Sequence, residues 1–257
     1  MAGRSMSSAF NAKSLEPTLK KAFRKGISAV ALAINCPGGQ PVQAALIASR
    51  IRELSDEFEI PVFAFCEDVA ASGGYWLACA ADEIYVDENS IIGSIGVIAA
   101  GFGAPKALAK LGIERRVYTA GTSKSTNDPF KPESPEDIKK LKVVLGDMHE
   151  SFKSIVRDRR KGKLKASEAI LFDGSFWTGR KAVELGLVDG LGHVRSTLKA
   201  RFGDKLEIRD ISAPRSLGQR WLGLGAASAS RHALATEFGE AALTVLEQRA
   251  LWARFGL

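Results

Sequence analysis

The N-terminal third of the chain alternates between short apolar runs and a longer stripe with helical period. The runs at 28–34, SAVALAI, and at 61–66, PVFAFC, are typical of strands buried in a parallel sheet. A loop after the second run leads to a helix of small residues that begins near Ser72. Between the two runs we expect a helix that buries one stripe of residues, Ile47, Ile51, Leu54 and Phe58.

The middle of the chain adds further strand-like pieces and one long helix. Runs at 83–86, 95–99 and 113–119 have the composition of strands. Ser134, followed by Pro135 and two acids, predicts the start of a helix. That helix carries one broad apolar face, Ile138, Leu141, Val144, Leu145, Met148, Phe152 and Ile155. Strands that alternate with helices predict an α/β fold with a largely parallel sheet flanked by helices.

The character of the chain changes after about residue 213. Pro214 is followed by a stretch rich in Gly, Ala and Ser, and then by a second helical pattern. We therefore predict a basic helical segment at 1–27, a main domain at 28–212, and a linker with a C-terminal helical arm at 213–257. The arm fits two placements equally well, on the body of its own chain or on a neighbouring subunit.

The net charge of +7 is unevenly distributed. Seven Lys or Arg and one acid lie between Lys153 and Lys165, and six bases and one acid lie in the first 25 residues. Such runs fit an anionic membrane surface or, more simply, a solvated helix face. No aromatic residues interleave the run and no zinc-finger or helix-turn-helix spacing is present, so nucleic acid is not expected as a partner.

Cysteine usage and hydropathy indicate neither a cofactor site nor a membrane anchor. Cys36, Cys66 and Cys79 form no CxxC pair, which argues against a zinc site or a disulfide framework. The longest uncharged stretch, 27–49, is broken by prolines and glycines and predicts strand, loop and helix rather than a span. We expect no metal, no cofactor and no signal peptide in the chain, and a cytoplasmic or membrane-associated location.

Two glycine-containing turns are the candidate sites of chemistry. Ser72 lies in ASGGY between an apolar run and a helix, where a helix N-terminus supplies free N–H groups, and Gly73 leaves room for a substrate carbonyl. The simpler interpretation is a helix cap without chemistry. Gly38 and Gly39 follow the run at 28–34, and two such turns at the carboxyl ends of neighbouring strands would face one cleft.

A nucleophilic serine needs a base. His149, His193 and His232 do not lie in turns at strand ends, so a Ser-His-Asp triad is disfavoured. A lysine serves instead where burial disfavours its ammonium form. Lys124, in the polar loop AGTSKS, is one of several candidates on these grounds alone.

Four segments in order resemble the signal peptide peptidase A family, the Ser/Lys proteases related in fold to Clp protease and crotonase. They are INCPGGQPVQ at 34–43, the nucleophile-like segment at 66–98, AGTSKSTNDPF at 120–130 and FWTGRKAVELGLVDGLG at 176–192. The likeness covers roughly 28–210. It implies a Clp protease/crotonase-like fold of repeated ββα-type units, with 28–212 as the protease domain and a homo-oligomeric assembly.

The resemblance also implies a role for each matched residue. Ser72 matches the nucleophile that forms an acyl-enzyme, and Lys124, 52 residues later (124 minus 72), matches its general base. Gly39 and Gly73 match the oxyanion-binding amides, and Ser94 matches the serine that positions the lysine. The implied activity is an endopeptidase that cuts apolar, signal-peptide-like peptides.

The chain departs from the family pattern in two places, and two other functions stay open. Cys36 replaces the usual serine, and the family's additional strand before the Pro-Gly-Gly segment is not evident in the 27 residues that precede 28–34. A crotonase-like acyl-CoA enzyme would need an acidic base, for which Glu67 and Asp68 are the nearest residues. An inactive assembly scaffold is the other alternative.

Overall fold

The computed structural model describes residues 11–121, 123–211 and 252–256. Its strands are β1 (Val30–Cys36), β2 (Val62–Ala71), β3 (Glu83–Val86), β4 (Ile91–Gly93), β5 (Phe176–Thr178) and β6 (Gly190–Leu191). Its helices are α1 (Ala12–Ala22), α2 (Pro41–Phe58), α3 (Gly73–Ala78), α4 (Pro105–Lys110), α5 (Pro135–Arg159), α6 (Glu168–Leu171), α7 (Gly179–Glu184) and α8 (Val194–Phe202).

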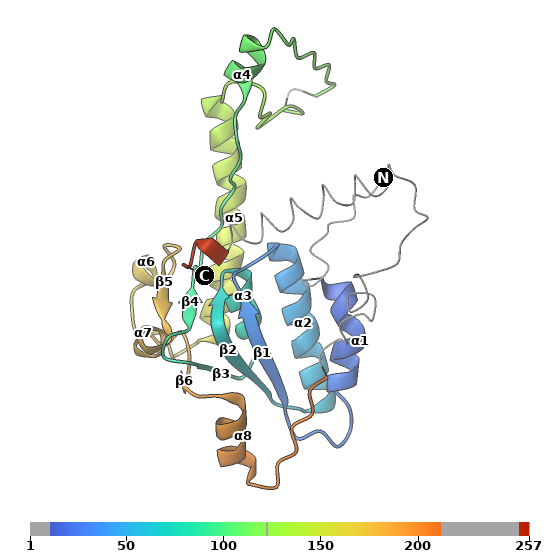
Figure 1. Cartoon of the computed structure of the whole chain (residues 1–257), viewed down its shortest axis with the longest axis vertical. Helices are drawn as coiled ribbons and strands as arrows, with labels where there is room; N and C mark the ends of the chain where they lie inside the picture. The colour runs from blue at the N-terminus through green and yellow to red at the C-terminus, as the bar shows by residue number, and fades with distance from the viewer. Residues whose placement is uncertain (1–10, 122, 212–251, 257) are drawn as a thin grey trace, which may run out of the picture.

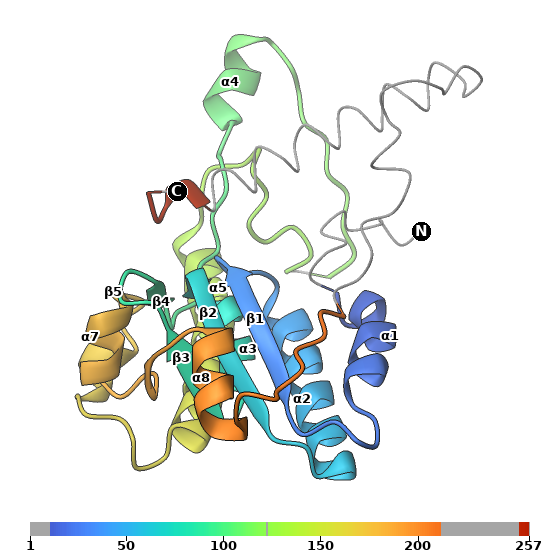
Figure 2. The same cartoon turned by 60° about the horizontal axis from the view of Figure 1, so that its bottom comes forward.

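The six strands form one sheet around β2. Its first half pairs with β1 and β3 and its second half with β4, all in parallel, while β5 joins β4 antiparallel. Helices α2 and α3 cover one face and α8 covers the other (Figure 2). The alternation along β2 explains the layers, because Val62 and Ala64 point into the main core while Phe63 and Phe65 pack against α8. The expected α/β class with a largely parallel sheet is confirmed.

The long helix begins as the sequence predicts, but only its second half belongs to the core. Ser134 caps α5 by accepting a hydrogen bond from the Asp137 N–H at 3.4 Å. Phe152 and Val156 are buried, whereas Val143 and Val144 are about half exposed. Figure 1 shows the first half of α5 leaving the sheet beside the segment that carries α4. We call residues 97–133 together with this first half of α5 the arm. It is distinct from the C-terminal helical arm predicted at 213–257.

Two strand predictions are wrong. Residues 95–99 follow β4 as irregular chain, and residues 113–119 form no strand in the arm. A strand requires a neighbouring strand to pair its backbone hydrogen bonds, and within the described chain none lies beside 113–119. The proposed boundary of the C-terminal arm and most of that arm, 213–251, fall outside the described residues, as do the first ten residues of the basic segment.

Five of the seven bases in the run at 153–165 make ion pairs within the described chain. Ion pairs join Lys153 and Arg157 to Glu150, Arg157 also to Glu168, Arg159 to Asp82, and both Arg160 and Lys163 to Asp189. Lys161 and Lys165 are exposed, so the run is partly the scaffold of α5 and its following turn and partly a solvated basic surface.

Candidate active site

Ser72 sits at the junction between β2 and α3 in a strained backbone conformation. Its φ of 52° and ψ of −122° lie in a region that residues with a Cβ rarely adopt. Its N–H donates to the Gly93 carbonyl at 2.8 Å, and its carbonyl accepts the Trp76 N–H at 3.0 Å. The preceding strand residues Ala70 and Ala71 are fully buried. The serine is thus held on a rigid turn at the carboxyl end of a central strand.

The two predicted glycine turns pack directly against each other. A Cβ placed on Gly38 would lie 3.1 Å from the Ser72 Cβ, and one placed on Gly73 would lie 3.2 Å from the Gly39 nitrogen. A Cβ on Gly74 would collide with the Cys36 carbonyl at 2.2 Å. The close approach therefore requires glycine. It brings Gly39 and Gly73 next to each other, close to Ser72.

A bulge in β1 aims the Pro-Gly-Gly turn at Ser72. The register of β1 against β2 shifts between Ile34 and Cys36, and the Asn35 side chain spans the gap by accepting the Val69 N–H at 3.2 Å. The Cys36 thiol donates to the Gly38 carbonyl at 3.3 Å. Burial raises the pKa of this thiol, so it remains protonated and a donor. Cysteine can therefore hold the turn as a serine hydroxyl would.

Ser94 occupies the equivalent position on the neighbouring strand. Gly93 of β4 pairs with Ala71 of β2, so the next residue on each strand is a serine at the same edge of the sheet. Ser94 has a φ of 51° and is 7% exposed, and its N–H donates to the Ser175 carbonyl at 2.7 Å. Both serines line the same cleft.

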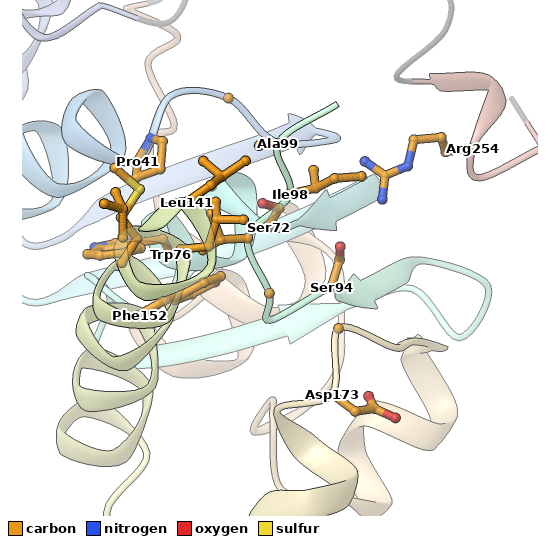
Figure 3. Close-up of a pocket in the computed structure, with 18 residues that line it drawn as sticks. Pro41, Ser72, Trp76, Ser94, Ile98, Ala99, Leu141, Phe152, Asp173 and Arg254 are labelled. Carbon is orange, nitrogen blue, oxygen red and sulfur yellow. The ribbon is translucent and has the colours of Figure 1, made fainter. Parts of the chain in front are cut away.

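This cleft has a volume of about 480 Å³ and an apolar wall on one side of Ser72 (Figure 3). Trp76, from the first turns of α3, stacks on Phe152 with ring centroids 4.9 Å apart. Its indole N–H is buried and has no hydrogen-bond partner among the described residues. The remaining apolar wall comes from the first half of α5: Leu141, Val144, Leu145 and Met148.

Lys124 is not brought to Ser72 within the chain. It is exposed in a turn of the arm, its N–H donates to the Gly121 carbonyl at 3.3 Å, and it is not among the residues that line the cleft. The predicted site is therefore assembled in part: Ser72, Gly39, Gly73 and Ser94 come together and Lys124 does not.

The alternative bases are placed elsewhere. The His149 Nε2 lies 3.0 Å from the Ile95 carbonyl, and His193 lies 3.5 Å from Asp87 in a separate groove. Glu67 and Asp68 line that groove as well, not the Ser72 cleft. His232 falls outside the described residues. Neither a histidine triad nor the acid expected of a crotonase-like enzyme is thus supported by these residues.

The cleft contains two charged residues that the sequence did not point to, Asp173 and Arg254. Asp173 accepts the Ser175 N–H at 2.8 Å, and the backbone and side-chain hydrogen bonds of Ser175 lower the pKa of this carboxyl. Arg254 comes from the C-terminal end of the chain. No spacing or motif links either residue to Ser72. Trp76, by contrast, lies one helical turn after Ser72, which was a usable signal.

No helix in the described ranges combines the length and the apolar character that crossing a bilayer requires.

Comparison with known proteins identifies the family of the chain. The family model "Peptidase family S49" matches residues 55–205, which hold Ser72, Ser94 and Lys124. A protein from Brucella abortus named Na(+)/H(+) antiporter NhaA is 49% identical over 257 residues, 95% of this chain and 35% of that protein. A relative from Enterococcus faecium that bears the name signal peptide peptidase SppA is 32% identical over 68% of this chain and 50% of its own length.

The chain thus spans half or less of these two relatives. A solved structure of 1510-N, a membrane-bound stomatin-specific protease with a substrate peptide, is similar at 15% identity and a TM-score of 0.46 over 74% of each chain. The family model covers more than half of this chain, and it confirms the resemblance that the four segments carry. This chain belongs to peptidase family S49.

Proposed function

We propose that the chain is a serine endopeptidase that cleaves peptides with apolar side chains through an acyl-enzyme on Ser72. The observation that carries the proposal is the strained turn at Ser72, surrounded by the two glycine turns and opening into an apolar cleft. Buried serine caps do not need a φ of 52° or a neighbouring row of bare amides. A substrate bound in the cleft would account for both features.

The proposed reaction runs in two steps. The Ser72 Oγ attacks the peptide carbonyl while its proton passes to a neutral lysine amine, and the Gly39 and Gly73 N–H groups bind the oxyanion. The resulting ammonium returns the proton to the departing amine, which leaves an ester on Ser72. Water, deprotonated by the same amine, then attacks the ester and releases the acid and free Ser72.

We assign Lys124 as the base, delivered by a neighbouring subunit. Within one chain its turn lies on the arm, which extends beyond the sheet (Figure 1). The arm exposes several large apolar side chains, Ile98, Phe102, Leu111, Ile113, Tyr118 and Val143. Burial of these side chains against a second copy would also bring Lys124, on the same arm, against that copy. Ser94, beside Ser72, is the expected partner of the incoming amine.

Mixing inactive variants tests this assignment. Ser72→Ala and Lys124→Ala are each expected to lower kcat for an apolar peptide by at least about a thousandfold. When the two variants are unfolded together and reassembled in equal amounts, about a quarter of the sites should contain an intact serine and an intact lysine from different subunits. A matched mixture of Ser72→Ala with wild type calibrates the reassembly.

Three outcomes separate the alternatives. Recovery of activity in the mixture supports a lysine acting between subunits. Inactive single variants without recovery would contradict delivery from a neighbour but leave the dyad. Near-normal turnover by either single variant would reject the dyad itself.

A further inference from the structure

The cleft has two unlike ends with Ser72 between them. One end is formed by Trp76 and the apolar residues of α5. The other contains the polar residues Ser94, Asp173 and Arg254, with Ile98 and Ala99 next to Arg254 (Figure 3). Figure 3 shows Ser72 between Trp76 and Arg254, with the Arg254 guanidinium directed back toward the centre of the cleft. A peptide that places an apolar side chain at the first end would pass Arg254 on the other side of Ser72.

The segment that carries Arg254 is held in place by the next residue, Phe255, while Arg254 itself is exposed to solvent. Phe255 is 8% exposed and packs on Val69 and Ala71, at the end of the strand that leads to Ser72. Its ring also meets Phe176 edge-on with centroids 5.1 Å apart. Trp252 packs against the same cluster. The anchor is apolar, so the guanidinium itself is not needed to dock this segment.

The guanidinium has no partner of opposite charge within the described part of the chain. None of the ion pairs or hydrogen bonds found there involves Arg254, and its ring contact is with Phe255, 6.0 Å from guanidinium carbon to centroid. Among the described residues, Asp173 is the one carboxylate that lines the cleft, and its Oδ1 accepts the Ser175 N–H. In Figure 3 it is turned away from Arg254, with Ser94 between them.

An arginine has five N–H donors in a fork that matches a carboxylate, and charge-assisted hydrogen bonds of this kind are about twice as strong as neutral ones. We infer that Arg254 is a specificity-determining residue that binds a carboxylate of the peptide substrate, on the side of the scissile bond opposite the apolar side chain. This inference rests on the proposed peptidase function. The carboxylate belongs either to an acidic side chain or to the peptide's own C-terminus, and both sources present the same chemistry.

Matched peptides test the inference. Each carries the same apolar side chain at the cleaved bond, with Glu or Gln at each of the two positions on either side and an amidated C-terminus. A third set carries Gln throughout and a free C-terminal carboxylate. The value of kcat/KM is measured for wild type, Arg254→Gln and Arg254→Lys. Arg209→Gln serves as control, because Arg209 is exposed and pairs locally with Glu207.

Wild type and Arg209→Gln should prefer the carboxylate peptide over its neutral match by about tenfold at one position. Arg254→Gln should bring this ratio close to one, and Arg254→Lys should leave an intermediate ratio that falls steeply with salt. The set that shows the preference identifies the source of the carboxylate. An equal ratio in wild type and Arg254→Gln would overturn the inference.

A binding measurement tests the inference independently of cleavage. The same peptides, labelled with a fluorophore, are titrated into the Ser72→Ala protein with Arg254 present or replaced by Gln. If replacing Arg254 by Gln weakens the Kd of the carboxylate peptide by about tenfold and leaves that of the neutral peptide unchanged, the inference is supported even when no turnover is found. Unchanged or undetectable binding of the carboxylate peptide overturns it. Failure of the proposed function appears separately, as turnover that persists in Ser72→Ala.

Discussion

At the scale of single residues, the turn at Ser72 is held in a conformation that costs stability. Ser72 and Ser94 both have positive φ, although both carry a side chain. Each such residue costs about 1–3 kcal/mol and persists because its surroundings hold it. The hydrogen bonds of the Ser72 N–H and carbonyl, to Gly93 and Trp76, are that constraint. The strain directs the hydroxyl into the cleft.

Replacing the strained serine by glycine should therefore stabilise the fold relative to replacing it by alanine. Both variants lose the hydroxyl, but only glycine adopts a φ of 52° without strain. After the entropy cost of glycine, the Ser72→Gly protein should be more stable than Ser72→Ala by about 1 kcal/mol in urea unfolding.

The control is Ser196, which is exposed on α8. There the order should reverse, with the glycine variant less stable than the alanine variant by about 1 kcal/mol. If glycine gives no advantage at 72, the backbone strain that we ascribe to the nucleophile is absent.

At the scale of elements, the sequence predicted the helices and strands that depend on hydrogen bonding and periodicity over a few residues. The Ser134 cap, the buried stripe of α2 and the strands near 28–34, 61–66 and 83–86 follow from hydrogen bonding and periodicity within a short window. The sequence predicted one broad apolar face on α5, and in the structure this face divides into a buried half and a half that lines the cleft. Sequence pattern does not separate these, because both halves are apolar.

The cleft half of α5 should determine the preference for apolar peptides. Leu145→Ala removes part of the wall and should lower kcat/KM for a peptide with a large apolar side chain by about tenfold, and less for one with alanine there. Leu46→Ala is the matched control, since Leu46 lies on α2 outside the arm, is 50% exposed and does not line the cleft. Equal effects of both substitutions would show that α5 does not contact the substrate.

The far end of α5 is fastened by a buried ion pair. Arg160, 2% exposed, donates to Asp189 at 2.6 Å and to the Gly186 carbonyl. Partial burial opposes ionisation of Asp189, but hydrogen bonds from Arg160, Lys163 and the Ile84 N–H outweigh it and lower its pKa. A lowered pKa means that the stabilisation is present above the unfolded value of about 4 and is lost as pH falls through the folded value.

Asp189→Asn should consequently reduce the free energy of unfolding at pH 7 by about 3 kcal/mol, because the Arg160 charge is left buried without a partner. The difference from wild type should begin to shrink as pH falls below about 4, because the Asp189 carboxyl of the unfolded wild type takes up a proton there while the folded one, with its lowered pKa, stays ionised to lower pH. Denaturant unfolding across pH 3 to 7 measures both. A difference that stays constant with pH would contradict the role of the carboxylate charge.

At the scale of the whole molecule, the sequence predicted which residues surround the nucleophile but not where the base lies. Ser72, Gly39, Gly73 and Ser94 follow strands that the sheet aligns, so their convergence is a consequence of topology. Lys124 lies on an arm whose position no strand register fixes. Arg254 reaches the cleft through the packing of its two aromatic neighbours, Trp252 and Phe255, and neither links Arg254 to Ser72 by spacing or motif.

The arm should mediate assembly of copies of this chain. Phe102 is 96% exposed, which is unusual for a large apolar side chain without a partner. Phe102→Glu should shift the protein to a smaller species in sedimentation velocity and, if Lys124 acts between subunits, lower kcat/KM by at least about tenfold. Glu207→Gln, on an exposed ion pair away from the arm, should change neither quantity. An unaltered assembly would place the subunit contact elsewhere.

The central claim concerns an amine that takes the proton from the Ser72 hydroxyl, and labelling measures this directly. A serine-directed acylating probe is applied from pH 6 to 10 to wild type, Lys124→Ala and Ser72→Ala, and the modified peptide is mapped by mass. We expect the label on Ser72, formed at least about a hundredfold more slowly in Lys124→Ala than in wild type. Labelling of another residue, or of Ser72 at the same rate with and without Lys124, would contradict the account.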